Sequence, residues 1–260
     1  MSKEHKNYLK KLKKEKFIVI FFQIFILIAF LVLWEFLSKY KIINPFIFSS
    51  PTKIVLTIKN LFINYNLINH ILTTLYETLI AFILGISLSF IIAIILYEFK
   101  IINKIIDPYL TMLNSLPKVA LGPLIIIIAG ANTKSIIVMA LFINLIVGII
   151  SIYNGFNNID PDLIKLFKTF KASRLDTLFK LTIPATYKTI ISSLKLNISM
   201  TLIGVIMGEF LVSKAGIGYL IIYGTQVFNL NMVMSGIVIL IFISFLLYKV
   251  IAYLEKILIK

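Results

Sequence analysis

The stretch "LIAFILGISLSFIIAIILY", Leu79–Tyr97, holds no charged side chain and is rich in isoleucine, leucine and phenylalanine. A helix of about 20 mostly apolar residues can cross the hydrocarbon core of a bilayer, because all its backbone polar groups are satisfied internally. The stretch therefore predicts a transmembrane helix. The whole chain agrees with this prediction, since 60% of its 260 residues are hydrophobic and its mean hydropathy is +1.00. These values exclude an ordinary soluble domain.

Five further segments are similarly apolar, and together they predict an all-α membrane protein with six transmembrane helices. The predicted helices are 17–37, 79–97, 110–131, 136–152, 190–212 and 232–251. The first is too long for the apolar region of a cleavable signal peptide, about 7–15 residues. We expect the third to be broken, because Pro117 removes a backbone donor and kinks the chain. The sequence therefore predicts a basic tail, 1–16, followed by a single transmembrane domain, 17–260.

The lysines and arginines predict the orientation of these helices. If the amino terminus lies inside, 18 of the 26 basic residues fall on the cytoplasmic side and 6 on the outer side. This distribution follows the positive-inside rule and places both termini and the loop 153–189 in the cytoplasm. Because the charges are spread over membrane-flanking segments, they do not indicate nucleic-acid binding. Cysteine is absent and only His5 and His70 occur, which argues against a disulfide framework or a metal site.

The loop 153–189 contains the charged stretch "KLFKTFKASRLDTLFKLTIP", Lys165–Pro184. Asp160 followed by Pro161 predicts the start of one short helix. "SRLD", Ser173–Asp176, is a variant of the capping box and predicts the start of a second helix, which we expect Pro184 to end. Both helices carry apolar stripes. The pattern fits either a helix pair packed under the membrane domain or a docking element for a cytoplasmic partner.

The spacing within this stretch is similar to the cytoplasmic signature of ABC importer permeases. That signature reads Glu-Ala-Ala, three residues, Gly, nine residues, Ile-x-Leu-Pro. Here Lys165–Phe167 takes the place of the first triplet, Lys171 that of the glycine, and "LTIP", Leu181–Pro184, closes it. Three further stretches resemble permeases of the nitrate, sulfonate, taurine and bicarbonate branch: "DPYLTMLNSLPKVALGPLIIIIAG" (Asp107–Gly130), "GFNNIDPDL" (Gly155–Leu163) and "GEFLVSKAGIGYLI" (Gly208–Ile221).

This resemblance implies a type I ABC importer permease (MetI-like) fold and a set of partners. The chain would be a homodimer in a bacterial plasma membrane, fed by an extracytoplasmic substrate-binding protein and driven by a separate ATPase subunit that holds ATP and Mg. The imported solute would be small, such as a sulfonate, nitrate, taurine or a thiamine precursor. The residues that would dock the ATPase are Lys171, Ala172, Ser173, Leu175, Asp176 and Pro184.

The sequence itself contains no GxxxxGK[ST] phosphate-binding loop, so we expect no ATPase site in this chain. We accordingly expect it not to be an enzyme, with no catalytic residue, metal ligand or cofactor of its own. An intramembrane hydrolase would need a serine–histidine or carboxylate pair that the pattern does not offer. The alternative function is a secondary transporter driven by an ion gradient. Such a transporter would place ionisable residues at the bilayer midplane, whereas the charges here lie mostly near helix ends.

Two groups of polar or small residues within the predicted helices are candidates for the solute route. One group shares a face of the fifth helix: Ser193, Asn197, Thr201, Gly204 and Gly208. Small residues at this spacing indicate a close-packed helix interface or a pathway, and in a permease dimer one face could serve both. The other group lies near Pro117: Asn114, Ser115 and Lys118. This second group would form an inner gate or a simple proline-kinked packing element.

Overall fold

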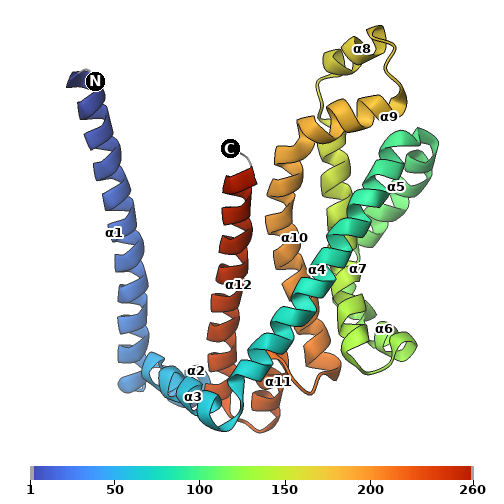
Figure 1. Cartoon of the computed structure of the whole chain (residues 1–260). Helices are drawn as coiled ribbons and strands as arrows, with labels where there is room; N and C mark the ends of the chain where they lie inside the picture. The colour runs from blue at the N-terminus through green and yellow to red at the C-terminus, as the bar shows by residue number, and fades with distance from the viewer. Residues whose placement is uncertain (1–2, 259–260) are drawn as a thin grey trace. The chain divides into compact units, whose positions relative to one another are not determined.

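A computed structural model describes residues 3–258, and within them the secondary structure is entirely helical (Figure 1), which confirms the predicted all-α class. In chain order the elements are α1 (Lys3–Lys39), α2 (Pro45–Phe48), α3 (Pro51–Asn64), α4 (Leu67–Glu98), α5 (Lys100–Ser115), the 3-10 turn η1 (Lys118–Leu121), α6 (Gly122–Ala129), α7 (Thr133–Asn157), α8 (Pro161–Thr169), α9 (Arg174–Thr177), the π-helical turn η2 (Leu178–Thr182), α10 (Ile183–Val212), α11 (Ile217–Gln226) and α12 (Leu230–Leu258).

The chain forms two compact units. One contains Met1–Tyr65 and Gly224–Ser235, and the other contains Asn66–Tyr223 and Gly236–Lys260.

Five helical segments of the described chain are long and apolar enough to cross a membrane. They are Lys10–Lys39, Leu67–Glu98, Thr133–Asn157, Arg174–Val212 and Leu230–Leu258. A sixth span results if α5 and the helix Lys118–Ala129, which meet at a bend of 92°, are counted as one. The bend lies at Leu116 and Pro117, where the sequence predicts a break. Leu116 is extended, with φ −68° and ψ 141°, as expected for the residue before a proline.

The smaller unit is formed around α1, α2 and α3. None of the most apolar part of α1 is buried within the chain, which suits a helix surrounded by lipid. Ser50 caps α3, its hydroxyl oxygen accepting from the Lys53 amide at 3.4 Å, and Pro51 occupies the first turn. The Thr52 amide donates to the Glu35 carboxylate at 3.0 Å and ties the start of α3 to α1.

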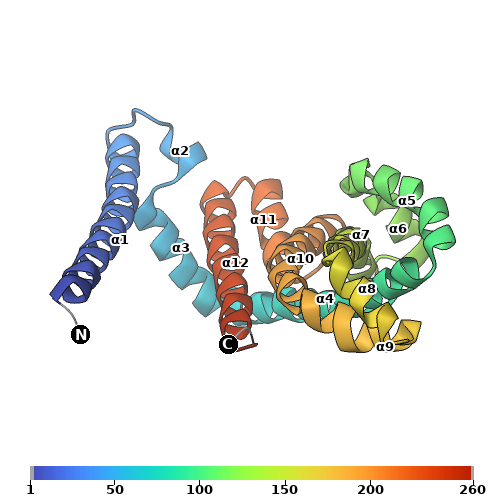
Figure 2. The same ribbon diagram turned by 90° about the horizontal axis from the view of Figure 1, so that it is seen from above.

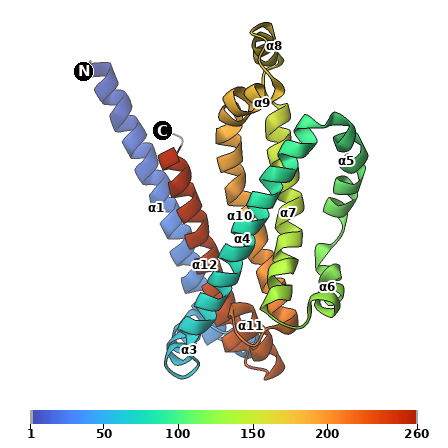
Figure 3. The same cartoon turned by 45° about the vertical axis from the view of Figure 1, so that its right-hand side comes forward.

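The larger unit is built around α4, α7 and α10, which lie side by side (Figures 1 and 3). In the view from above, α7 lies next to α10 (Figure 2). Small residues bring these two backbones close together. A Cβ atom added at Gly204 would lie 2.6 Å from the Cα atom of Ala140, and one at Gly208 would lie 2.9 Å from a methyl carbon of Ile136. Close backbone approach of this kind is how membrane helices associate without a hydrophobic driving force.

The two ends of this bundle differ. At one end α8 and α9 connect α7 to α10, and at the other a short loop connects α10 to α11 (Figures 1 and 3). We call residues 160–182, from the cap of α8 to the end of η2, the elbow. It falls within the loop that the sequence predicts to be cytoplasmic.

Candidate docking elbow and polar faces of the bundle

The elbow begins with the helix cap that the sequence predicts. The Asp160 side chain accepts from the Asp162 amide at 2.9 Å, and Pro161 takes the first position of α8. Proline suits this position because its missing amide would have no partner inside the helix. Lys165 then pairs with Asp162 at 2.8 Å on the exposed surface. These local contacts confirm the predicted start of α8.

Helix α8 ends in a Schellman motif with Lys171 at its left-handed position. Lys171 has a φ of +55°. Its amide donates to the Lys168 carbonyl at 3.0 Å, and the Ala172 amide donates to the Phe167 carbonyl at 3.1 Å. Glycine is the usual residue at this position, because a side chain costs about 1–2 kcal/mol in the left-handed region. The turn therefore keeps the conformation that glycine would give it, although a lysine occupies the position.

The second helix of the elbow starts with the predicted capping box. The Ser173 hydroxyl oxygen accepts from the Asp176 amide at 3.0 Å, and the Asp176 carboxylate accepts from the Ser173 amide at 3.4 Å. Asp176 also pairs with Lys180. Two of the amides that the helix start would leave unpaired thus have a side-chain partner. The chain direction between α8 and α9 is consequently fixed by short-range contacts.

Pro184 does not end the second helix, and that expectation is wrong. Helix α9 passes through η2 directly into α10, in whose first turn Pro184 lies. Proline is accommodated within this continuous helix because the π-helical turn η2 directly before it already interrupts the regular α-helical hydrogen bonding. In η2 the hydrogen bonds shift to the wider π pattern, and the Ile183 amide donates to the Leu178 carbonyl. The elbow is therefore helically continuous with α10.

The elbow exposes large apolar side chains. Five of them are 41–75% exposed: Leu163, Leu166, Phe170, Leu175 and Phe179. Leu178 and Leu181 instead point inward and are buried. On a surface that faces water, a large exposed apolar patch indicates an interaction site. The elbow therefore has one apolar face buried against the bundle and another that is exposed.

The predicted polar face of α10 is buried within the chain. Asn197 and Thr201 are fully buried, and Ser193 is 7% exposed. Their side chains donate to carbonyls of α10 itself: Asn197 to Ser193 at 3.0 Å and Thr201 to Asn197 at 2.7 Å. Gly204 and Gly208 on the same face lie against α7. In this structure these residues form a close-packed contact inside one subunit.

The predicted gate residues gather at the break between α5 and η1. The Lys118 ammonium group donates to the backbone carbonyl of Asn114 at 3.0 Å and to its side-chain oxygen at 3.3 Å. The Ser115 hydroxyl donates to the Thr111 carbonyl at 2.9 Å. The bonds from Lys118 satisfy a carbonyl at the end of α5, where the helix has no further amides to offer, and Ser115 bonds back to its own helix. The cluster is thus a helix terminus held together by its own side chains.

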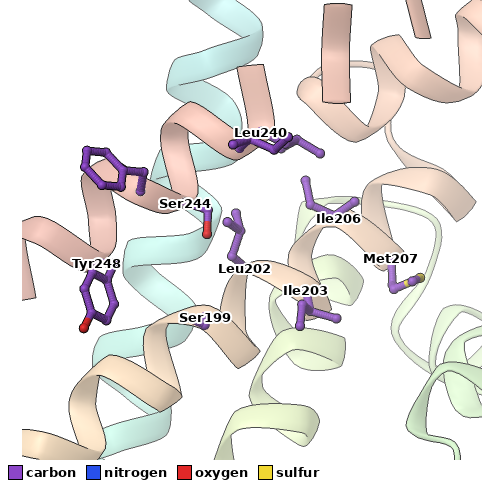
Figure 4. Close-up of a pocket in the computed structure, with 10 residues that line it drawn as sticks. Ser199, Leu202, Ile203, Ile206, Met207, Leu240, Ser244 and Tyr248 are labelled. Carbon is purple, nitrogen blue, oxygen red and sulfur yellow. The ribbon is translucent and has the colours of Figure 1, made fainter. Parts of the chain in front are cut away.

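A separate groove opens between α10 and α12 (Figure 4). Its volume is about 570 Å³. Its lining is mostly apolar, and Figure 4 shows the hydroxyl groups of Ser244 and Tyr248. Ser199 also lines the groove, with its hydroxyl donating to the Lys195 carbonyl of its own helix. The groove lies on a different face of α10 from Ser193, Asn197 and Thr201. It is an open surface on α10 that the sequence pattern did not single out.

Several buried polar residues of the bundle are missing from the sequence-based candidates. They are Thr74, Glu77, Thr78, Ser89, Asn144 and Glu209, all at most 1% exposed. Thr74 and Glu77 were not candidates because the predicted helix begins at 79, which places both in its flank, whereas α4 begins at Leu67. Their spacing of three residues, which places them on one helix face, was the available signal.

The fold defines a class: a multi-pass helical membrane protein in which two helices of the bundle are joined by a segment with exposed apolar side chains. Within that class, the family model described as "Binding-protein-dependent transport system inner membrane component" matches residues 85–260. The chain belongs to this family.

Two relatives and one solved structure illustrate the relationship. The chain is 26% identical to the "Putative aliphatic sulfonates transport permease protein SsuC" of Bacillus subtilis, over 88% of this chain and 83% of that protein. It is 29% identical to a "Probable ABC transporter permease protein" of Haemophilus influenzae, over 84% and 88%. A structure of the MetNI methionine ABC transporter in an inward-facing conformation matches with a TM-score of 0.68 and 15% identity, over 75% of this chain and 97% of that chain. The last match shows the fold.

These findings identify the chain as an ABC importer permease subunit with a MetI-like fold in the sulfonate, nitrate and thiamine-precursor branch. Permease subunits of this family are not enzymes themselves. Membership implies an ATPase subunit and a substrate-binding protein as partners. The alternative of an ion-gradient-driven secondary transporter finds no support among the relatives.

Proposed function

We propose that this chain, as a homodimer in a bacterial plasma membrane, imports a small solute. An aliphatic sulfonate is the first candidate because a relative 26% identical carries that substrate in its name. Nitrate, taurine and thiamine precursors are the other candidates from the branch. ATP and Mg bind to the separate ATPase subunit and not to this chain. The three-to-one excess of basic residues on one side supports cytoplasmic termini and a cytoplasmic elbow.

The exposed apolar face of the elbow carries this proposal. Leu175 and Phe179 are 64% and 63% exposed, and Phe170 is 75% exposed. Leaving such side chains in water is unfavourable by roughly 1.5–3 kcal/mol each relative to burial, so a partner that covers them gains affinity. The docking residues are Lys171, Ala172, Ser173, Leu175, Asp176 and Pro184. Of these, Pro184 contributes by its place in the first turn of α10.

The helical continuity of α9, η2 and α10 gives a route for mechanical coupling. When the ATPase subunits close on ATP, they displace the elbow, and α10 moves with it as one element. The Thr182 hydroxyl lies 3.4 Å from the Tyr97 hydroxyl at the end of α4, which links the displacement to a second helix. Differential binding of the ATPase to the two arrangements of the elbow then shifts the balance between inward-open and outward-open states.

The groove between α10 and α12 is the surface that this proposal favours for the solute route. The face with Ser193, Asn197 and Thr201 is occupied by packing within the chain, whereas Ser199, Ile203 and Met207 line open space. Apolar walls with a few hydroxyl groups fit a solute with an aliphatic body. Replacing Ile203 with tryptophan should reduce uptake while ATPase binding stays unchanged. Unchanged uptake would contradict this route.

The docking proposal is tested with the permease purified together with the ATPase encoded next to it. We expect Leu175→Glu to lower coupled ATPase activity and uptake at least about tenfold, since a buried unpaired carboxylate opposes docking. Leu12→Glu is the matched control, because Leu12 is 42% exposed in the amino-terminal segment. Equal activity of the Leu175 variant and the wild type would contradict docking through the elbow. Equal loss in both variants would show a non-specific effect of the added charge and would also contradict it.

The homodimer and the substrate need separate measurements. The mass of the purified assembly, determined by light scattering with the detergent contribution subtracted, should correspond to two copies of this chain and two ATPase subunits. An assembly with one copy would contradict the homodimer. Uptake of a labelled aliphatic sulfonate by reconstituted vesicles with the binding protein present checks the substrate, with nitrate, taurine and a thiamine precursor as competitors. Competition by nitrate alone would overturn the sulfonate assignment.

A further inference from the structure

Two acidic side chains are buried near one another at the end of the bundle opposite the elbow. Glu77 of α4 is fully buried and Glu209 of α10 is 1% exposed. Their carboxyl groups are close enough to interact electrostatically. Neither takes part in the ion pairs found among residues 3–258, which join Lys165 to Asp162, Lys180 to Asp176 and Lys195 to Glu255. Two ionised carboxylates in such a site repel one another strongly, because the surroundings screen charge poorly.

The hydrogen bonds around Glu209 show that it acts as an acceptor. The Thr74 hydroxyl donates to one carboxylate oxygen at 2.6 Å, and the Gly218 amide donates to the other at 2.5 Å. The Thr74 hydroxyl has a single proton, and its oxygen meanwhile accepts from the Ile217 amide at 2.9 Å. An ionised carboxylate is an acceptor at both oxygens, so this pattern matches an ionised Glu209.

Glu77, in contrast to Glu209, accepts no hydrogen bond from the described groups. Both of its carboxyl oxygens lack a hydrogen-bond partner among the described groups. Thr74 lies three residues before it on α4, and residues at this spacing share a helix face, so Glu77 projects toward Glu209 as Thr74 does. A buried polar group without a partner costs free energy, and a buried charge without one costs more. A proton on Glu77 removes its charge and supplies the donor that the site lacks.

The loop between α10 and α11 depends on this site. Gly216 has a φ of +104°, and a Cβ atom there would collide with the Glu209 carboxylate. The Gly216 amide donates to His70 Nδ1 at 3.0 Å, so this ring nitrogen carries no proton. With Ile217 bonded to Thr74 and Gly218 to Glu209, three successive amides are held by side chains of α4 and α10.

We propose that Glu77 is a neutral carboxylic acid that donates its proton to the Glu209 carboxylate, and that this pair positions the loop 213–218 against α4. The site thus binds one proton within the membrane-spanning bundle. Its role is to hold the connection between α10 and α11, the two elements that meet at this end. The proposal does not depend on the solute or on the ATPase.

Infrared spectroscopy of the full chain in lipid at neutral pH tests the proton directly. We expect the carbonyl band of a protonated carboxylic acid in the wild type, shifted on exchange into D2O. The band should vanish in Glu77→Gln and persist in Glu98→Gln, a partly exposed glutamate at the end of the same helix. A wild-type spectrum without the band would overturn the proposal whatever the variants do, as would an unchanged band in Glu77→Gln. A pair of ionised carboxylates that binds a cation would give a wild-type spectrum without the band.

Hydrogen exchange of the loop amides tests the positioning role. Glu209→Gln presents an NH2 group to one of the two donors, so we expect the Gly218 amide to exchange about tenfold faster. Glu77→Gln still donates to Glu209 and should stay within about twofold of the wild type. Thr74→Val, which removes the acceptor of the Ile217 amide, serves as a second variant if Glu209→Gln does not fold. Wild-type exchange in Glu209→Gln, or in Thr74→Val where that variant is used instead, would overturn the positioning role.

Discussion

The elbow and the bundle of α4, α7 and α10 use the same kinds of side chain in opposite ways. In the elbow, polar side chains such as Asp160 and Ser173 lie at the surface and cap helices, while leucines and phenylalanines stay exposed. In the bundle, Asn197 and Glu209 are buried, and apolar side chains such as Leu84 face outward. The bundle pattern is expected where lipid is the solvent, because apolar groups then gain nothing from mutual burial. In water, exposed apolar groups need another reason, and the proposed docking of the ATPase subunit would supply it.

The largest effect should come from placing the same charge in both regions. Leu84→Asp puts a carboxylate on the outward face of α4, where insertion costs about 2.5–3.5 kcal/mol. Leu175→Asp alters an exposed residue of the elbow and should change folding stability by less than about 0.5 kcal/mol. The amount of membrane-inserted protein and its melting temperature in detergent measure both. If the two variants lost stability equally, the elbow would not be a water-exposed surface.

Close packing of α10 on α7 should give the next largest effect. Gly204→Ala forces a methyl group against the backbone of Ala140, and we expect a loss of about 1–3 kcal/mol in the free energy of unfolding. Gly155→Ala on α7 is the control, because its new methyl group would meet a Thr189 methyl carbon at 3.2 Å and can displace it. Denaturant titration in mixed micelles measures both. A smaller loss at Gly204 than at Gly155 would argue against a tight helix contact there.

A hydroxyl group should matter more in the elbow than in the bundle. Ser173→Ala removes a helix cap and should destabilise the elbow by about 1 kcal/mol, so that the Asp176 amide exchanges roughly fivefold faster. Ser199→Ala removes a hydroxyl that donates to the Lys195 carbonyl of its own helix, and little change is expected. Hydrogen exchange followed by mass spectrometry covers both segments. Unaltered exchange in Ser173→Ala would show that the capping box does not hold the turn.

The features that the sequence predicts well are those set by neighbouring residues. The caps at Asp160 and Ser173 depend on backbone amides two or three residues further along the chain. The break at Pro117 depends on the restricted dihedral angles of proline. The start of α4 at Leu67 was not predicted, because the mixed segment before residue 79 becomes helical through packing against other elements.

The candidate site was also predictable only where it depends on neighbouring residues in the sequence. The small residues of α10 indicated close packing, but which helix they meet depends on the tertiary arrangement. Glu77 and Glu209 lie far apart in the sequence and close enough in the fold to interact electrostatically, and hydropathy carries no signal for this proximity. The expectation that Pro184 ends a helix was wrong because the π-helical turn before it accommodates the proline within a continuous helix, and the local sequence pattern does not show that turn.

The smallest effect concerns Lys171, a lysine held in the left-handed backbone region that glycine favours. Lys171→Gly removes the Cβ atom that makes a φ of +55° costly, and part of the gain is offset because glycine also makes the unfolded chain more flexible. We expect a net stabilisation of the elbow of about 0.5–1 kcal/mol, seen as slower exchange of the Ala172 amide. Lys171→Ala separates the effect of the charge on exchange from the effect of the backbone conformation, because it keeps the Cβ atom and loses the ammonium group. If the two variants changed exchange equally, the lysine would act through its charge, and the left-handed turn would not be what limits the stability of the elbow.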